Sequence, residues 1–337
     1  MEFEWIFRQG SGFRRESLPP PSACKKDMAI VRPKWVGICG SDLYFMATSK
    51  EDLRLGHEWV GVVESVGPGS SEISAGDLVT STATWGCAAC EYCGTQKTNL
   101  CGRPTNLSSP KMGALRSWFE VPASQLIPVN GPADPSLALH EVLAVADEAV
   151  RLATASGPTT MDGEWMILGA GTVGVLAALV AREQGFRVTP VDPNLDRVNR
   201  AKSLGLSALS LPEALLDRAH HRRYSVLIDA TSNYSGGTGG FPLYTTFCKP
   251  EFQAVVVGKY VESPLIPQSL FRTAANLTWM RGVPLDGLKS SVKKWNGRTS
   301  EIAASVISHI YPQEEMTAAF ERAKSQDGCL KVVVALA

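Results

Sequence analysis

Short apolar runs alternate with longer amphipathic stretches through the middle of the chain. Residues 165–168 are all apolar, as is typical of a short strand buried on both faces of a parallel sheet. A glycine-rich turn follows, and the small apolar residues 175–181 after it predict a helix. A second short strand covers residues 186–192. The same alternation predicts one more helix and two more strands, over residues 197–205, 225–230 and 254–258. This order predicts a doubly wound α/β domain.

The first third of the chain has a different pattern. Its apolar stretches are short, as over residues 59–66, and glycine and proline interrupt them. This pattern predicts a domain of small strands and turns. With 337 residues the chain is long enough for two domains of ordinary size.

Composition narrows the function classes. The 33 basic and 33 acidic residues give a formal net charge of zero, which favours neither nucleic acid nor an anionic membrane as a partner. The longest apolar stretch, residues 173–181, is far shorter than the ~20 residues of a membrane span. No apolar segment with a cleavage site follows the charged first residues, so we expect a soluble, cytoplasmic protein without a membrane partner.

The glycine turn predicts a dinucleotide site. Gly169 suits the tight turn, Gly171 lets the backbone approach a pyrophosphate, and Gly174 lets the helix pack closely on the strand. Thr172 and Val173, between the last two glycines, begin the helix whose N-terminus would face the phosphates. A second glycine-rich stretch, residues 235–240, lacks the strand and helix around it, and we interpret it as a connection.

Asp192 ends the second strand about twenty residues after the glycines, where an acid would accept a hydrogen bond from the ribose hydroxyls. A carboxylate there favours NAD over NADP because it would repel a 2′-phosphate. The alternative is that Asp192 only caps the following helix. Arg197 weakens this preference for NAD, since its guanidinium could tolerate the 2′-phosphate of NADP nearby.

Four cysteines, Cys87, Cys90, Cys93 and Cys101, lie within one short stretch. Gaps of two residues let a turn direct successive sulfurs at one point, and four thiolates make a closed tetrahedral zinc site. Such a site stabilises a loop and leaves no position for substrate. The alternatives are two disulfides or buried thiols, and a bridge between Cys87 and Cys90 would need strained geometry.

A second metal constellation comes earlier in the chain. Cys39 lies in the string Gly-Ile-Cys-Gly-Ser-Asp, and His57 follows eighteen residues later in Gly-His-Glu-Trp-Val-Gly. A thiolate, an imidazole and a loose carboxylate are typical of a catalytic zinc that keeps one open position.

These two strings, the four-cysteine segment and the glycine turn occur in one order that resembles the zinc-dependent medium-chain dehydrogenase/reductase family. The resemblance implies an α/β protein in which a Rossmann doubly wound parallel sheet joins a GroES-like, mainly-β catalytic domain. We therefore expect the catalytic domain over residues 1–145 with its zinc lobe at 86–102, the NAD-binding domain over 146–285, and a return to the catalytic domain over 286–337.

The resemblance also implies two zinc ions per chain. Cys39 and His57 would ligate the catalytic zinc, with Glu58 as a nearby acid that either ligates or stays within reach. The segment that begins at Glu141 looks like the Glu-Pro-Leu-Ala-Val-Ala of polyol-type relatives, with Val142 in place of the proline. This places Glu141 as the last ligand, directly or through water.

By the same resemblance, the activity is NAD-dependent oxidation of a secondary alcohol to a ketone, by hydride transfer from a zinc-bound alkoxide. The alcohol would be a polyol, sugar, cyclitol or threonine-like compound. Ser41 would bond the substrate oxygen and begin a proton relay, Tyr44 stands where many relatives have a relay histidine, and Asp42 would orient a ligand. Thr231 and Gly258 complete the expected cofactor contacts.

Two other functions stay open. One is an NADPH-dependent reductase of carbonyls or alkenes, and the other is a silent NAD-binding protein that keeps only the structural zinc. Family relatives are dimers or tetramers, so we expect a homo-oligomer with residues 254–258 as a plausible contact. Four aromatic residues could also form an apolar wall of the substrate cleft: Tyr44, Phe45, Trp59 and Trp118.

Overall fold

The chain forms two compact units in this computed structural model, which describes residues 2–70, 72–131, 133–155, 163–232, 240–259, 267–295, 297–325 and 327–336. Unit 1 comprises Met1–Ala144, Val283–Ser325 and Lys331–Ala337, and unit 2 comprises Val145–Gly282 and Gln326–Leu330. Two of the divisions lie within three residues of the predicted domain boundaries. The short segment that unit 2 takes from the C-terminal part was not anticipated.

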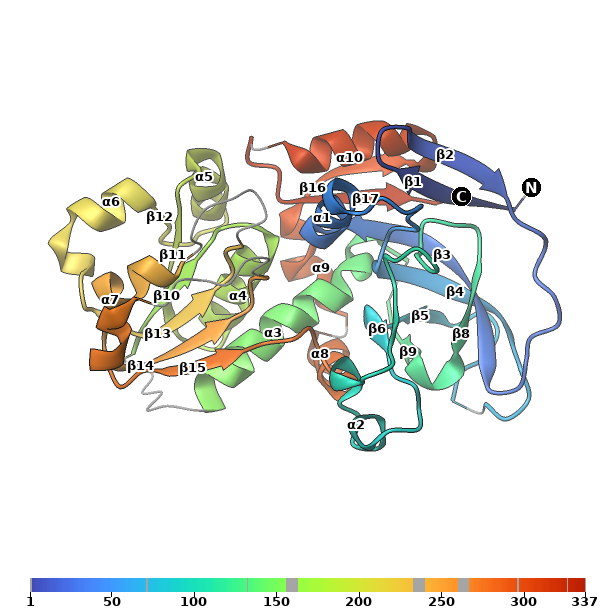
Figure 1. The fold of residues 1–337 in the computed structure, drawn as a ribbon, viewed down its shortest axis with the longest axis horizontal. Helices are drawn as coiled ribbons and strands as arrows, with labels where there is room; N and C mark the ends of the chain where they lie inside the picture. Colours follow the sequence, from blue (N-terminus) through green and yellow to red (C-terminus); the bar gives the residue numbers. More distant parts are fainter. Residues whose placement is uncertain are drawn as a thin grey trace. The chain divides into compact units, whose positions relative to one another are not determined.

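Unit 2 is built on one parallel sheet of six strands in the order β12-β11-β10-β13-β14-β15 (Figure 1). Its strands are β10 (Glu164–Leu168), β11 (Arg187–Asp192), β12 (Leu209–Ser210), β13 (Tyr224–Asp229), β14 (Cys248–Val256) and β15 (Asn276–Trp279). Its helices are α4 (Thr172–Glu183), α5 (Leu195–Ser203), α6 (Leu211–Leu216) and α7 (Tyr244–Phe247), and α3 (His140–Ala155) begins in unit 1 and continues into it. The predicted doubly wound sheet is confirmed.

The turn between β10 and α4 has the backbone that its glycines permit. Gly169 has a φ of +94°, which a residue with a side chain rarely adopts. A β-carbon on Gly174 would lie 1.8 Å from the carbonyl oxygen of Gly169, so only glycine lets α4 approach the turn this closely. Gly171 faces open space, with no atom within 4 Å of the position of a β-carbon.

The carboxyl ends of the neighbouring strands carry the other predicted cofactor residues. Asp192 ends β11, and its two carboxylate oxygens accept hydrogen bonds from the backbone N–H groups of Ala170 and Asn194, at 2.7 and 2.8 Å. The cap of α5 is Asn194, whose side chain accepts from the N–H of Arg197, so Asp192 is not the helix cap. Beyond β14, Gly258 lies so close to the Thr231 carbonyl that no side chain would fit.

The expectation that residues 254–258 form an oligomer contact is wrong for the strand within that range. Strand β14 is hydrogen-bonded to β13 on one side and to β15 on the other, so it has no free edge. The prediction failed because the sequence did not reveal β15, a strand of only four residues. The glycine-rich stretch 235–240, apart from Gly240, lies outside the described residues.

Unit 1 is built on a mostly antiparallel sheet in the order β16-β17-β3-β4-β5-β9, with β8 paired to β3. Its strands are β1 (Phe3–Arg8), β2 (Gly12–Ser17), β3 (Met28–Ile38), β4 (Glu58–Val66), β5 (Leu78–Thr80), β6 (Thr84–Trp85), β7 (Thr105–Asn106), β8 (Phe119–Pro122), β9 (Ile127–Pro128), β16 (Ile307–Pro312) and β17 (Lys331–Ala335). Its helices are α1 (Gly40–Thr48), α2 (Glu91–Gly94), α8 (Leu285–Trp295), α9 (Thr299–Ile302) and α10 (Met316–Lys324). The long strand β3 is the centre of this sheet, and β17 brings the end of the chain beside it.

Aromatic residues fill the core of unit 1. Trp59 is fully buried and packs edge-on against Phe119, with ring centroids 4.9 Å apart. Trp59 therefore belongs to the core and not to a substrate wall. The indole N–H of Trp118 donates to the carbonyl of Pro19.

Within the described residues, we find no helix that combines the length and apolar character needed to cross a membrane.

The glycine turn makes a stability prediction. Replacing Gly174 by alanine forces a β-carbon against the Gly169 carbonyl, and we expect a loss of about 1–3 kcal/mol in the free energy of unfolding. Gly171→Ala is the matched control, since its β-carbon enters open space at an ordinary φ of −74°, and it should change stability by no more than about 0.5 kcal/mol. Urea unfolding followed by circular dichroism measures both. Equal losses would mean that close helix packing is not what Gly174 provides.

Candidate functional site

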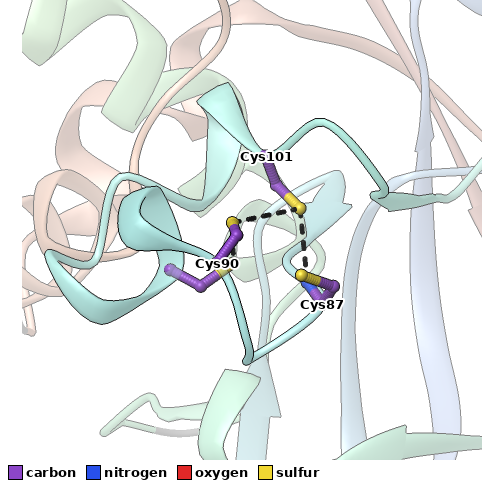
Figure 2. A group of neighbouring side chains, drawn as sticks. Cys87, Cys90 and Cys101 are labelled. Carbon is purple, nitrogen blue, oxygen red and sulfur yellow. Dashed lines mark hydrogen bonds between the residues drawn. The ribbon is translucent and has the colours of Figure 1, made fainter.

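The four cysteines of the lobe lie on a segment whose two ends are held together by the short strand pair β6 and β7. Helix α2 and the turn that follows it place Cys90, Cys93 and Cys101 opposite Cys87. Figure 2 shows the sulfur atoms of Cys87, Cys90 and Cys101 directed toward one another. All four sulfur atoms lie within 4.8 Å of one another.

The spacing of the sulfurs fits zinc. Cys90 Sγ lies 3.4 Å from Cys93 Sγ and 3.8 Å from Cys101 Sγ. Four sulfurs each ~2.3 Å from a central zinc lie about 3.8 Å from one another. Backbone N–H groups of Cys87 and Arg103 donate to the sulfur of Cys101, and such bonds favour a thiolate. The N–H of Ala89 is the main cause that lowers the pKa of Cys87 to about 6.

A second group of possible metal ligands comes from two segments of unit 1. Cys39 precedes α1, and His57 and Glu58 lie where β4 begins. The ligand atoms of Cys39, His57 and Glu58 lie within 4.8 Å of one another, and Glu58 is fully buried. Burial alone would lower the pKa of His57, but the charges of Asp42 and Cys39 outweigh it and raise that pKa well above its usual value. The surroundings of His57 are therefore electronegative and favour a positive charge there.

The carboxylate of Asp42 joins the segments that carry these residues. It accepts hydrogen bonds from the backbone N–H of Cys39 at 2.9 Å and of Gly56 at 3.3 Å. The hydroxyl of Ser108 donates to it as well, at 2.5 Å. Burial would raise the pKa of Asp42, but the charge of His57 and the hydrogen bonds from His57, Ser108 and the N–H of Cys39 together outweigh that effect and lower the pKa. A single buried carboxylate thus fixes the chain on both sides of the group.

Glu58 is paired with a lysine from the far end of the chain. Lys331, at the start of β17, donates to both carboxylate oxygens of Glu58, at 2.8 and 2.6 Å, and to the carbonyl of Ile38 at 3.0 Å. Both side chains are buried, with 3% of Lys331 and none of Glu58 exposed. A β-carbon on Gly37 would lie 2.5 Å from a Glu58 oxygen, so the glycine makes room for this pair.

Glu141 lies in the first turn of α3 and is buried beside this group. Burial is the main cause that raises its pKa to about 7; the charge of Glu58 adds to the rise, while His57, Lys331 and the N–H of Ala83 oppose it. Its carboxylate is not among the ligand groups that lie within 4.8 Å of one another, which are those of Cys39, His57 and Glu58. It is close enough to His57 and Glu58 to interact with both electrostatically.

Ser41 and Tyr44 lie one turn apart on α1, and both are half-buried. Ser41 Oγ is 3.3 Å from His57 Nε2, so the structure brings this hydroxyl to the ligand group. The ring of Tyr44 packs against that of Phe45, with centroids 5.7 Å apart.

Sequence reasoning missed two residues of this site, Lys331 and Ser108. A single lysine ahead of the apolar residues 332–334 was a weak signal for a buried charge. Ser108 carried no signal, because it lies in a polar stretch 51 residues from His57.

In unit 2, the carboxyl ends of the strands hold Asp192, Thr231 and Gly258 as described above, and Arg197 Nη1 lies 3.8 Å from Asp192.

Comparison with known proteins identifies relatives of the chain. Residues 25–131 match the model of the alcohol dehydrogenase GroES-like domain. A protein of Emericella nidulans named Probable D-xylulose reductase A is 31% identical over 207 residues, which cover 58% of this chain and 56% of that protein. The chain thus spans little more than half the length of this relative. The L-threonine 3-dehydrogenase of Coxiella burnetii is 23% identical over 330 residues, covering 93% of this chain and 92% of that enzyme.

The fold also matches solved structures. An alcohol dehydrogenase from Escherichia coli CFT073, crystallised with NADH, superposes with a TM-score of 0.83 over 99% of both chains, at 20% sequence identity. At that identity the match establishes the shared fold: a GroES-like domain joined to a Rossmann domain.

The buried pair of Glu58 and Lys331 makes a second stability prediction. Lys331→Met keeps the aliphatic stem but leaves the Glu58 carboxylate buried without a partner, and we expect a loss of about 3–5 kcal/mol in the free energy of unfolding. Adding Glu58→Gln removes the unpaired charge and should restore most of that loss. Urea unfolding at a fixed zinc concentration measures the free energy of unfolding of the wild type, of Lys331→Met and of the double variant. A double variant no more stable than Lys331→Met would mean that the lysine acts by packing.

Proposed function

We propose that this chain is a member of the zinc-dependent medium-chain dehydrogenase/reductase family of alcohol and polyol dehydrogenases, and that it oxidises a secondary alcohol to a ketone with NAD. The observation that carries the proposal is the group of half-buried Cys39 with buried His57 and Glu58, and with buried Glu141 beside it. The relatives named as xylulose reductase and threonine dehydrogenase support a polyol or an amino alcohol as substrate.

The residues present fit a catalytic zinc. One thiolate, one imidazole and one or two carboxylates form the mixed ligand set of such sites. We propose that Cys39, His57 and Glu141 hold the ion, because both oxygens of Glu58 are already bonded to Lys331. The raised pKa of Glu141, about 7, means that a cation would stabilise its charged form. When bound, zinc supplies a Lewis acid that polarises the substrate hydroxyl.

We assign the proton to residues of α1. Ser41 Oγ lies beside the ligand group, where it can accept the proton of the substrate hydroxyl. Tyr44, one turn further along the helix, is half-buried and can pass that proton toward solvent. Glu58 and Lys331 neutralise each other, so they add no net charge to the reacting centre.

The cofactor proposal is NAD, bound at the carboxyl ends of β10 and β11. Gly171 leaves the space that a pyrophosphate needs, and NAD supplies the hydride acceptor. The carboxylate of Asp192 is held in place by two backbone N–H groups, so it is fixed where it would meet the ribose hydroxyls and repel a 2′-phosphate.

For assembly, we propose a homodimer formed along β15. This strand is an edge of the unit 2 sheet among the described residues, and Trp279 at its end is 51% exposed. An exposed edge with an aromatic side chain is a surface that a second copy can cover. Light scattering on the purified protein decides between monomer and dimer.

We further propose a cytoplasmic location, because the four thiols would stay reduced there and could bind zinc. Cell fractionation tests this location.

The central experiment counts zinc and measures turnover on protein purified without chelator. We expect two zinc ions per chain, and NAD reduction with at least one member of a panel of polyols, sugars, aminocyclitols, threonine and simple secondary alcohols. Cys90→Ser should lose one zinc and stability but keep turnover per folded molecule. Glu141→Gln should lose the other zinc and turnover.

Two outcomes would contradict the proposal. One zinc and no turnover in the wild type would favour a silent NAD-binding protein. Activity only on carbonyls or alkenes with NADPH would favour a reductase. If Glu141→Gln keeps both zinc ions and full turnover, Glu141 is not a ligand.

Cofactor preference gives a separate prediction. We expect NADH to bind more tightly than NADPH by at least roughly tenfold, which corresponds to about 1.4 kcal/mol. Asp192→Ala should narrow that gap, as fluorescence titration would measure. Asn194→Ala is the matched control, because it removes the cap of α5 and leaves the acid in place. An unchanged preference in Asp192→Ala would exclude a role for this carboxylate in recognising the ribose.

A further inference from the structure

Ser108 lies between the imidazole of His57 and the carboxylate of Asp42. Its hydroxyl oxygen is 2.8 Å from His57 Nδ1 and 2.5 Å from Asp42 Oδ1, and only 3% of the residue is exposed. His57 Nδ1 itself is 3.3 Å from the same Asp42 oxygen. The serine hydroxyl therefore contacts each of the two groups more closely than they contact each other, and it supports His57 together with the longer direct contact to Asp42.

The hydrogen atoms in this chain of contacts can be assigned by counting donors. An ionised carboxylate only accepts hydrogen bonds, and Asp42 already accepts from the N–H groups of Cys39 and Gly56. Ser108 has one hydroxyl hydrogen, which it donates to Asp42. Its oxygen then accepts from His57 Nδ1–H. An imidazole that ligates a metal is neutral, and with its hydrogen on Nδ1 it presents the lone pair of Nε2, the nitrogen on the side of Ser41 Oγ.

The backbone shows that this hydroxyl is held in position. Ser108 has a φ of +57°, in the left-handed region that residues with a side chain seldom adopt. The residues on either side are fixed independently of its side chain. Leu107 N–H donates to the Ala83 carbonyl, and Ser109 exchanges two backbone hydrogen bonds with Arg54. A substitution at 108 can therefore remove the hydroxyl without releasing the loop.

We propose that Ser108 is a positioning residue for the metal centre: it holds His57 in the tautomer and ring orientation that directs Nε2 toward Cys39. Ser108 touches neither metal nor substrate and acts through His57. The inference rests on the proposed function, since it concerns the ligand geometry of the same zinc site. Groups that orient a ligating histidine in this way raise metal affinity by roughly 10–100-fold.

Three variants of Ser108 and one neighbour separate this role from a structural one. Ser108→Ala removes the hydroxyl, and Ser108→Gly removes it while suiting the positive φ. Ser108→Thr keeps the hydroxyl but places a β-branched residue at that φ. Ser109→Ala is the matched control, because its hydroxyl bonds only the backbone of the same loop, at Lys111 and Met112.

The readouts are zinc affinity by competition with a chromophoric chelator, the visible spectrum of the cobalt-substituted protein, and Tm. We expect Ser108→Ala and Ser108→Gly to weaken the second metal site by roughly 10–100-fold and to shift its cobalt bands. Ser108→Gly should have a higher Tm than Ser108→Ala, because glycine suits the positive φ while both variants lose the same hydrogen bond to Asp42. Ser108→Thr should lower Tm and keep the metal affinity within about threefold of wild type, on the reasoning that its hydroxyl is retained. Ser109→Ala should change Tm alone.

Wild-type affinity and unchanged cobalt bands in both Ser108→Ala and Ser108→Gly would overturn the inference. So would a loss of affinity in Ser109→Ala equal to that in Ser108→Ala, because the effect would then belong to the loop. A wild-type protein that binds a single metal, in the cysteine lobe, would instead overturn the proposed function. The two failures are therefore distinguishable.

Discussion

The carboxylate of Asp42 is the constraint on which the rest of the candidate site depends. Cys39 and His57 lie on different segments, and neither segment is a regular element at that point. Asp42 fixes one through the N–H of Cys39 and the other through the N–H of Gly56. Since a buried carboxylate is stable only when its oxygens are fully bonded, the same contacts that stabilise Asp42 also place the ligand-bearing backbone.

The second buried carboxylate, Glu58, is stabilised differently. It is paired with Lys331 and lies against the open backbone of Gly37, so it is rigid and neutralised. Glu141 has no such cationic partner among the hydrogen bonds and ion pairs of the described residues, and its pKa is raised to about 7. Two neighbouring glutamates thus have opposite electrostatic environments, which is why they can have different roles toward a cation.

Local pattern sufficed to predict most of the fold. Residues 165–192 carry a strand, a glycine turn, a helix and a second strand in sequence, and the pattern that identifies each of them lies within that segment. Strand β15 escaped prediction because it has only four residues, and its pairing with β14 is not visible in the sequence. The residues of the candidate site also divide into those that the local sequence reveals and those that it does not. Cys39 and His57 lie in recognisable strings, whereas Lys331 reaches Glu58 across 273 residues and Ser108 reaches Asp42 across 66. No local pattern encodes contacts of that separation.

The strand pair β6 and β7, which closes the cysteine lobe, also affects the order in which parts of the chain can fold during synthesis. Strands β6 and β7 bring residues 84 and 106 together, and all four thiols lie between them, so this group of thiols is complete once that short segment has left the ribosome. Loops of this length close quickly. The mixed group at Cys39 cannot be finished then, because Lys331, which pairs with Glu58, is synthesised long after residue 106. Synthesis therefore separates the two groups in time, and zinc bound by the four cysteines, as proposed, would stabilise the nascent chain before the group around Cys39 is assembled.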